Sequence, residues 1–461
     1  MTVTRTADLV IVGGGISGTA LLFAAARYSD IRRILLIEKY PGLAQVNSAA
    51  THNSQTLHCG DIETNYTLAK ALKVKRAAAL VENYATRLVP DETLLHRYSK
   101  MVLGVGPEEC ARLRARFAEF GPHYAALRLF ETAEIARLEP KVVTAQGKMR
   151  PAEKSLLHFP HSRHPWRSEE LVAYGAENEY SAANFSALAA SFATQARAAN
   201  KEVELLLNTR VTQVRTTGNA FEVVTEAGVI AAGSVVVSAG GHSLSLAQQM
   251  GYGQEFSCLP VAGSFYFAPT VLNGKVYTVQ NDKLPFAAIH GDPDLLVPGA
   301  TRFGPTALIL PELERYNLAT VLDFLRVVRF DAALFKVLWD MFADRDVRRY
   351  IFKNILFEIP LIRRRLFLHE ARKIVPSLEA RDLRFAHRVG GLRPQIIDRN
   401  AKRLLMGEAK IDPGNGAIFN MTPSPGATSC LDNAEQDLRS VARHLGATFD
   451  EVRFCAELEG R

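Results

Sequence analysis

Three glycines near the start of the chain have the spacing of a phosphate-binding loop. Gly13, Gly15 and Gly18 form the pattern G-x-G-x-x-G directly after the apolar run DLVIV (8–12). In such a loop the first glycine permits a tight turn, the second admits a pyrophosphate close to the backbone, and the third lets a helix pack against the strand. A helix that begins there points free N–H groups at the phosphates. The loop therefore predicts a nucleotide site.

The residues around this loop complete a dinucleotide-binding unit. The segment 17–28 has helical composition, and RILLIEK (33–39) forms a second apolar strand that ends at Glu38. An acidic side chain about twenty residues after the loop accepts hydrogen bonds from a ribose hydroxyl. Because a carboxylate there disfavours a 2′-phosphate, the sequence argues against NADP. Ile16, Ser17 and Lys39 are predicted to contact the cofactor as well.

Three histidines are candidate proton acceptors. His52 and His58 lie in a polar, irregular segment (43–67), and His290 lies in NDKLPFAAIHGDPD (281–294). Imidazole titrates near neutral pH, so it can take up a proton and return it. His52 is the first candidate, His58 and His290 are alternatives, and a chemistry without a histidine base stays open.

One arginine has a setting that suits a carboxylate ligand. Arg393 follows two glycines in GGLRPQIID (390–398), and a guanidinium binds a carboxylate through two parallel hydrogen bonds. We expect Gly391 to let the backbone approach a neighbour and Pro394 to stiffen a turn. The alternative is an ordinary surface or salt-bridge arginine.

The composition is that of a folded protein of two or three domains in a reducing compartment. The chain has 461 residues, of which 48% are hydrophobic, and its five cysteines include no CxxC pair. No metal site is predicted, because prolines interrupt the histidines of HFPHSRHPW (158–166). There is no uncharged apolar stretch of membrane-spanning length and no nucleic-acid motif. These features predict a cytoplasmic protein that does not bind nucleic acid.

The rest of the chain predicts a mixed α/β protein with a nucleotide domain assembled from separated segments. SVVVSAGG (234–241) is a third buried strand, far along the chain from the glycine loop. The expected elements are helices over most of 68–135, loops and short strands over 141–180, a helix at 184–200, short strands over 203–241, strands and loops over 256–310, and helices over 316–375.

Four separated segments resemble the FAD-dependent oxidoreductases of the D-amino-acid-oxidase-like superfamily. They are DLVIVGGGISGTALLFAAA…LLIEK, NTRVTQV before SVVVSAGGHS, GGLRPQIID, and GAIFNMTPSPGATSCLDNAE. The resemblance implies FAD as the cofactor, with its adenosine and pyrophosphate on the first segment and its flavin ring facing the last. It assigns to the cofactor the further residues Val211, Ala239, Gly240, Gly426, Ala427 and Thr428.

Within that superfamily the chain is most similar to the malate:quinone oxidoreductase group. NSAATHNSQTLHCGDIETNYT (47–67), NFSAL (184–188), GHSLSLAQQMG (241–251) and the helical stretch 316–375 carry this likeness. THNSQTLH and SPGATSCLDNAE are equally similar to the L-2-hydroxyglutarate oxidase group, so the acid is left open. The segment 51–62 is longer than its counterpart in the malate group, so either His52 or His58 can match that group's histidine, and His290 matches only loosely.

The resemblance implies oxidation of a small 2-hydroxy acid to the 2-oxo acid by hydride transfer to flavin N5, with a quinone as electron acceptor. It places the substrate carboxylate on Arg393 and makes Thr51, Asn53 and Ser54 cofactor or substrate contacts. The alternatives are an amino-acid oxidase that uses oxygen and a flavoprotein scaffold without catalysis.

The resemblance also suggests domain boundaries. The FAD-binding domain takes 1–90, 181–255 and 386–461, and a mixed-sheet substrate domain takes 91–180 and 256–385, with a helical insertion at 316–375. Between residues 326 and 373 there are twelve Lys and Arg and six Asp and Glu, a net charge of +6 out of +7 for the chain. This insertion is either a peripheral surface on the inner face of the cytoplasmic membrane or a helical unit packed on the core.

Overall fold

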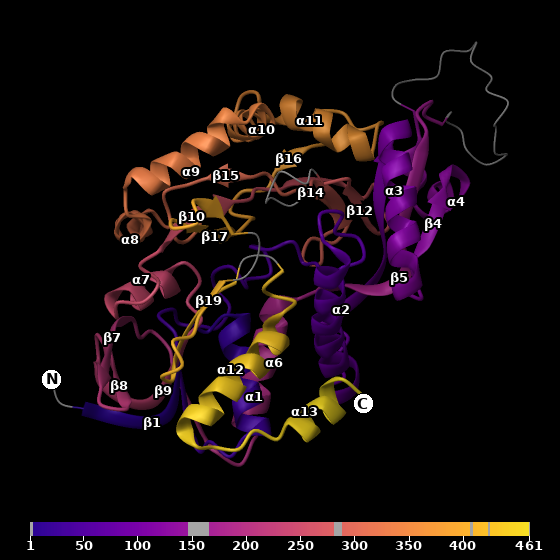
Figure 1. Cartoon of the computed structure of the whole chain (residues 1–461). Helices are drawn as coiled ribbons and strands as arrows, with labels where there is room; N and C mark the ends of the chain where they lie inside the picture. Colours follow the sequence, from indigo (N-terminus) through magenta and orange to yellow (C-terminus); the bar gives the residue numbers. More distant parts are fainter. Residues whose placement is uncertain (1–2, 146–165, 281–287, 406–408, 423–424, 461) are drawn as a thin grey trace, which may run out of the picture.

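A mainly parallel sheet forms the centre of the nucleotide-binding part (Figure 1). The computed structural model describes residues 3–145, 166–280, 288–405, 409–422 and 425–460. In spatial order the strands are β19 (Ala409–Ile411), β20 (Ala417–Met421), β9 (Gly228–Val237), β1 (Val3–Val12), β2 (Arg33–Ile37) and β6 (Glu202–Leu206), with β7 (Val211–Thr217) and β8 (Ala220–Thr225). The sheet is parallel from β20 to β6, and β19 is antiparallel at one edge. The hairpin β7–β8 pairs with β9 through β8.

Both faces of this sheet are covered, which explains the continuous apolar run in β1. Leu9 and Ile11 join a core with helices on one face, whereas Val10 and Val12 join a second core on the other face, because successive side chains of a strand point to opposite sides. The helices of the first face lie side by side in Figure 1 and contact one another. They are α1 (Ile16–Tyr28), α6 (Phe185–Arg197) and α12 (Cys430–Leu445), flanked by α2 (Leu68–Asn83), η1 (Tyr84–Leu88) and α13 (Glu451–Leu458).

Strands from the beginning, middle and end of the chain therefore meet in one sheet. This confirms the predicted mixed α/β fold with a nucleotide-binding sheet of separated segments. The helix predicted at 184–200 and the strands predicted over 203–241 are confirmed as α6 and β6–β9. The proposed domain boundaries stay a prediction.

A second, mixed sheet and a small antiparallel sheet lie beyond the nucleotide-binding part. The mixed sheet has the order β16 (Arg384–Phe385), β11 (Tyr266–Pro269), β14 (Ala300–Gly304), β13 (His290–Pro293), β12 (Lys275–Thr278), β3 (Leu95–Val105), β5 (Leu171–Ala183) and β4 (Arg128–Glu131). The small sheet has the order β15 (Leu308–Ile309), β10 (Phe256–Ala262), β17 (Leu392–Asp398) and β18 (Arg403–Leu404). The connecting helices are α3 (Pro107–Phe120), η2 (Gly121–His123), α4 (Thr132–Leu138), α5 (Pro140–Val143) and α7 (His242–Gln249).

Two local predictions are wrong here. The stretch 68–135 is mostly helical, as predicted, although it also contains β3 and β4, but 141–180 contains the long strand β5 rather than short strands. β3 and β5 pair along nearly their whole length, so long-range pairing overrides the helical composition of the neighbourhood. Pro394 lies within β17 opposite Pro260 rather than in a turn. Most of HFPHSRHPW lies outside the described residues.

The stretch 316–375 is helical, as predicted. In Figure 1 its helices form an arch over the small and mixed sheets. Asp331 and Asp344 cap two of them by accepting hydrogen bonds from backbone N–H groups of the first turn. The helices are η3 (Leu318–Thr320), α8 (Val321–Val328), α9 (Ala332–Ala343), α10 (Arg345–Leu356) and α11 (Arg363–Ile374).

Candidate active site

The glycine loop lies between β1 and α1 and needs glycine at two positions. Gly13 has φ +112°, and a Cβ there would overlap the carbonyl of Ser238 at the end of β9. A Cβ at Gly18 would overlap the carbonyl of Gly13, so the third glycine lets helix and loop pack together. Helix α1 begins at Ile16 without a side-chain cap from its N-cap residue, Gly15.

A cavity of about 470 Å³ opens at this loop and extends along the carboxyl ends of the parallel strands. This is the position at which open α/β sheets bind nucleotides. The predicted cofactor residues that line it are Gly13, Gly15, Ile16, Ser17, Glu38, Lys39, Val211, Ala239, Gly240, Gly426 and Ala427. Segments remote in the chain thus meet around one elongated ligand site.

A second cavity of about 110 Å³ adjoins the first. Both are lined by Asn47, Pro394, Thr422, Gly426 and Ala427. The smaller cavity also brings together five residues predicted from the sequence, namely His52, Asn53, Ser54, His58 and Arg393. Loop 47–58 and strand β17 supply this group, which a linear sequence does not place together.

Four predicted residues lie outside the lining of both cavities. Gly18 packs on the loop, and the Thr51 carbonyl accepts a hydrogen bond of 2.9 Å from the N–H of Gly390. The hydroxyl of Thr428 accepts a hydrogen bond from the N–H of His58 at 3.1 Å. These three residues support the site rather than line it.

The fourth of these residues, His290, is 1% exposed and stacks on Tyr277 with ring centroids 4.4 Å apart. Burial, reinforced by the cations Lys275 and Arg302, lowers the pKa of His290 to about 3, against the opposing effect of Asp292. The ring is therefore neutral, and His290 is not among the residues that line either cavity.

Glu38 has a structural role in addition to the predicted one. Its carboxylate accepts hydrogen bonds from the backbone N–H groups of Gly14 at 2.7 Å and Tyr40 at 2.9 Å. It lines the larger cavity and so braces the glycine loop from the end of β2. The ribose contact stays a prediction.

Arg393 is a half-buried cation on β17. Burial lowers its pKa, while the neighbouring Tyr350, Tyr66 and Tyr277 oppose that shift, and a guanidinium stays charged at any physiological pH. Among the residues that the structure describes, the side chain of Arg393 has no ion-pair or hydrogen-bond partner, although its backbone pairs with Val261 of β10. A desolvated charge without a counter-ion is costly, so this position suits an anionic ligand.

The two histidines of the small cavity have different partners. His52 donates its Nδ1–H to the carbonyl of Val46 at 2.9 Å. His58 has its Nδ1 2.5 Å from a carboxylate oxygen of Glu63, which is 9% exposed. In each ring the remaining nitrogen, Nε2, is then the acceptor of the neutral imidazole.

Several site residues were missed by the sequence-based assignment. Asn47 lines both cavities and accepts a hydrogen bond from the N–H of Leu392 at 3.1 Å, which ties the loop to β17. Ser48 accepts a hydrogen bond from the N–H of Ile16 at 2.9 Å. Both belong to the polar segment before His52. The polarity of that segment was the one feature of the sequence from which their place at the site could have been predicted.

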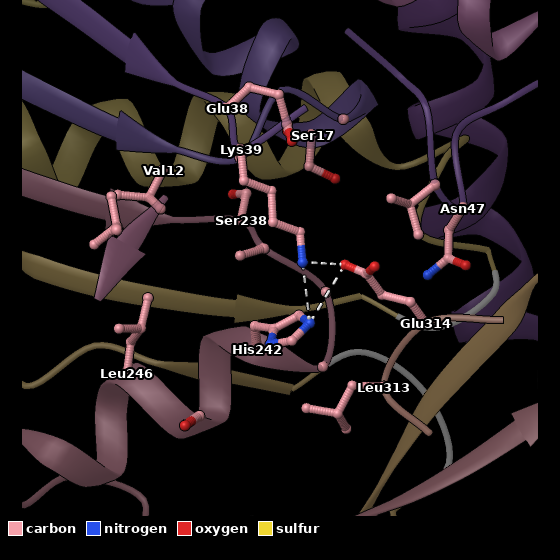
Figure 2. A pocket seen from close by; sticks show the side chains of 18 of the residues that line it. Val12, Ser17, Glu38, Lys39, Asn47, Ser238, His242, Leu246, Leu313 and Glu314 are labelled. Atoms are coloured by element: carbon pink, nitrogen blue, oxygen red, sulfur yellow. Dashed lines mark hydrogen bonds and ion pairs between the residues drawn. The ribbon is translucent and has the colours of Figure 1, made fainter. Parts of the chain in front are cut away.

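Two more missed residues, His242 and Glu314, form an ionic clasp with the predicted Lys39 beside the larger cavity. Figure 2 shows Lys39, His242 and Glu314 converging from three different segments. Lys39 forms an ion pair with Glu314, and His242 Nε2 lies 3.3 Å from the same carboxylate. Tyr40 donates its hydroxyl to Glu314 at 2.5 Å. We refer to Lys39, His242 and Glu314 as the clasp; its carboxylate comes from the segment just before the helical insertion and carries no local sequence signal.

The chain matches a family model described as FAD dependent oxidoreductase over residues 8–431. It is 45% identical to a probable malate:quinone oxidoreductase of Campylobacter jejuni over 98% of both chains. It is 42% identical to the malate:quinone oxidoreductase of Helicobacter pylori strain 26695, over 98% of this chain and 97% of that one. The chain belongs to the malate:quinone oxidoreductase family. L-2-hydroxyglutarate dehydrogenases match at only 24% identity.

Solved structures of FAD-dependent oxidoreductases have a fold similar to that of this chain. L-alpha-glycerophosphate oxidase from Mycoplasma pneumoniae, a structure with FAD bound, has a TM-score of 0.62 at 18% identity and covers 97% of this chain and 96% of its own. The malate:quinone oxidoreductase family is one of flavoproteins, and the residues present fit FAD. The larger cavity provides a glycine cradle, a helix start whose N-cap residue is the glycine Gly15, and a continuation to Gly426 and Ala427 beside the smaller cavity.

Proposed function

We propose that this protein oxidises malate to oxaloacetate and delivers the electrons to a quinone. Relatives named for this reaction share 42–45% of their residues with the chain over nearly its full length. FAD bound in the larger cavity would supply the redox chemistry, namely uptake of a hydride from C2 of the acid and onward transfer of the electrons. The protein's own side chains bind the acid, orient it and move its proton.

Arg393 is the observation that carries this proposal. A half-buried guanidinium without an anionic partner among the described residues lines a small cavity directly beside the cofactor cavity. A carboxylate of malate bound there forms charge-assisted hydrogen bonds in one plane. The substrate is then held in a fixed orientation toward the adjoining cavity. Binding of the carboxylate thereby aligns the reacting carbon with the cofactor site before the reaction begins.

His58 is the base that we favour within this pocket. It lines the small cavity, and its Nδ1 faces the carboxylate of Glu63, which compensates a positive charge on the ring. His52 lines the same cavity but donates its Nδ1–H to a neutral backbone carbonyl. We therefore propose that the hydroxyl proton of malate is taken by Nε2 of His58, and that His52 and Asn53 shape the pocket.

Anaerobic bleaching of the bound flavin by malate tests the proposal. Wild-type protein should lose its oxidised flavin absorbance when malate is added. Arg393→Met should keep the yellow cofactor but lose at least about 10²-fold in the second-order rate of bleaching, because removal of a charged hydrogen-bond partner costs several kcal/mol. Arg381→Met is the control, since the Arg381 side chain is 80% exposed. Failure of malate to bleach the wild type would reject the function.

We further propose that the helical insertion docks on an anionic membrane surface, where a lipid-soluble quinone is available. No helix among the described ranges is long and apolar enough to cross a bilayer. Large apolar side chains are nevertheless exposed along the arch, together with its many cations. The most exposed are Leu318, Leu322, Phe330, Phe335, Trp339, Phe352 and Leu361.

Co-sedimentation with vesicles tests this docking. Wild-type protein should bind vesicles that contain anionic lipid more tightly than neutral vesicles, and salt should weaken the binding. Trp339→Glu and Leu361→Glu should reduce it, whereas Val452→Glu, a change at an equally exposed apolar residue on α13 away from the arch, should not. Equal loss in all three variants would contradict a specific surface.

A further inference from the structure

Glu63 is a buried carboxylate that faces the proposed base, His58, from behind the small cavity. One oxygen lies 2.5 Å from Nδ1 of His58. The other oxygen is buried and has no hydrogen-bond partner in the part of the chain that the structure describes. Burial alone would raise the pKa of Glu63, but the hydrogen bond from His58, the positive charge of the protonated His58 ring and the charge of Lys100 hold it below the ordinary value. The carboxylate is therefore ionised.

A second buried pair sets the charge around it. Asp61 and Lys100 form an ion pair of 2.7 Å with side chains that are 5% and 3% exposed. The two charges of this pair cancel, so Glu63 contributes the uncompensated negative charge of the group formed by Asp61, Glu63 and Lys100. A proton arriving on His58 would neutralise it, which favours the imidazolium that a base must form.

The backbone of Glu63 is held by a side chain of α3 and by a local turn. Arg116 of α3 donates a hydrogen bond of 2.7 Å to the Glu63 carbonyl and one of 3.1 Å to the carbonyl of Tyr66. The N–H of Tyr66 bonds in turn to the Glu63 carbonyl at 3.1 Å. A side chain anchored in this way can fix the orientation of its partner, because its own backbone has little freedom.

We propose that Glu63 is a positioning residue for His58. It accepts the Nδ1–H of the imidazole, which leaves the lone pair of the neutral ring on Nε2. When the malate hydroxyl gives up its proton to Nε2, the ionised carboxylate balances the new charge while remaining ionised itself. His52 has no such partner, since its Nδ1–H goes to the carbonyl of Val46. This inference rests on the proposed function.

Two variants separate the charge of Glu63 from its hydrogen bond. Glu63→Gln keeps the size and one acceptor oxygen but removes the charge, and Glu63→Leu removes both. In anaerobic stopped-flow bleaching at saturating malate, we expect rates about 10²-fold lower for Gln and lower still for Leu, in the range typical of general-base catalysis. The concentration of malate at half-saturation should change less than about threefold, because Arg393 still binds the carboxylate.

Bound FAD and a second buried carboxylate provide the controls. All variants should retain the FAD content of the wild type, and Glu139→Gln should bleach at the wild-type rate, since Glu139 is 1% exposed and bonds to Asn273 and Gly274 instead. A wild-type rate in Glu63→Gln would overturn the inference, as would a loss of FAD in proportion to the loss of rate. Absence of bleaching in the wild type would instead reject the malate reaction itself.

Discussion

Gly391 is the point at which the strand of Arg393 touches the loop of His52. A Cβ built on Gly391 would lie far closer to the His52 carbonyl than the 3.0 Å that real Cβ atoms respect, and 3.3 Å from the amide oxygen of Asn47. The backbone of Gly391 does not have a positive φ. The contact alone therefore opposes a side chain, and Gly391→Ala is a clean test of how closely the two segments must approach.

The size of the effect follows from this geometry. Relief of the overlap requires a separation of the loop and β17 on the order of 1 Å, and a displacement of that size can cost about 10²-fold in rate. The hydrogen bond of 3.1 Å from the N–H of Leu392 to Asn47 would stretch at the same time. Overpacking of this kind typically costs about 1–3 kcal/mol of stability.

The assay is anaerobic stopped-flow bleaching of the flavin, with bound FAD and the melting temperature measured on the same samples. We expect Gly391→Ala to retain FAD but to fall about 10²-fold in the rate constant at low malate concentration. Gly121→Ala is the matched control, because a Cβ there meets only the ring of Phe117 at 3.5 Å, an ordinary contact. Bleaching within about threefold of wild type by Gly391→Ala would refute the view that this contact sets the distance between Arg393 and His52.

Two further predictions concern the ion pairs. Glu314→Gln should release FAD faster than wild type, measured by the rise in flavin fluorescence on dilution, because it breaks the ion pair with Lys39 beside the cofactor cavity; an unchanged release rate would contradict a role for the clasp in retention. Partial burial opposes ionisation of Glu457, but hydrogen bonds from Arg27 and Arg453 lower its pKa to about 2. A depressed folded-state pKa adds stability above the unfolded value of about 4.3 and loses it as the pH falls toward 2. Glu457→Gln should therefore melt below wild type at pH 6, and the difference should shrink between about pH 4.5 and pH 2.

Local patterns were enough to predict the nucleotide-binding unit. The apolar run before Gly13, the spacing to Gly18 and the acidic end of the next strand lie within one stretch of chain, and β1, α1 and β2 form as predicted. The same holds for α6 and the helices of the arch. In these segments the period of the apolar residues and the glycine spacing act over a few turns or one strand, so no distant partner is needed to choose the structure.

Predictions failed where a distant partner chooses the conformation. The stretch 141–180 was predicted to hold loops and short strands, yet β5 is long and pairs with β3 more than sixty residues earlier in the sequence, with Lys100 opposite Ala176. Pro394 suits a turn by type but lies in β17 opposite Pro260. Propensity is a weak preference beside the burial of a whole strand in a sheet.

The sequence by itself determined the cofactor class, the family and the residue types able to bind an acid and move its proton. Only the tertiary structure decided how these residues are used. It brings Arg393, His52 and His58 to one cavity, buries His290 outside the lining of that cavity, and gives His58 a carboxylate partner. The reason is physical. The charge and shape of a side chain depend only on the residue type, which the sequence gives. Desolvation, the geometry of a partner and close backbone contact arise only once distant segments have packed together.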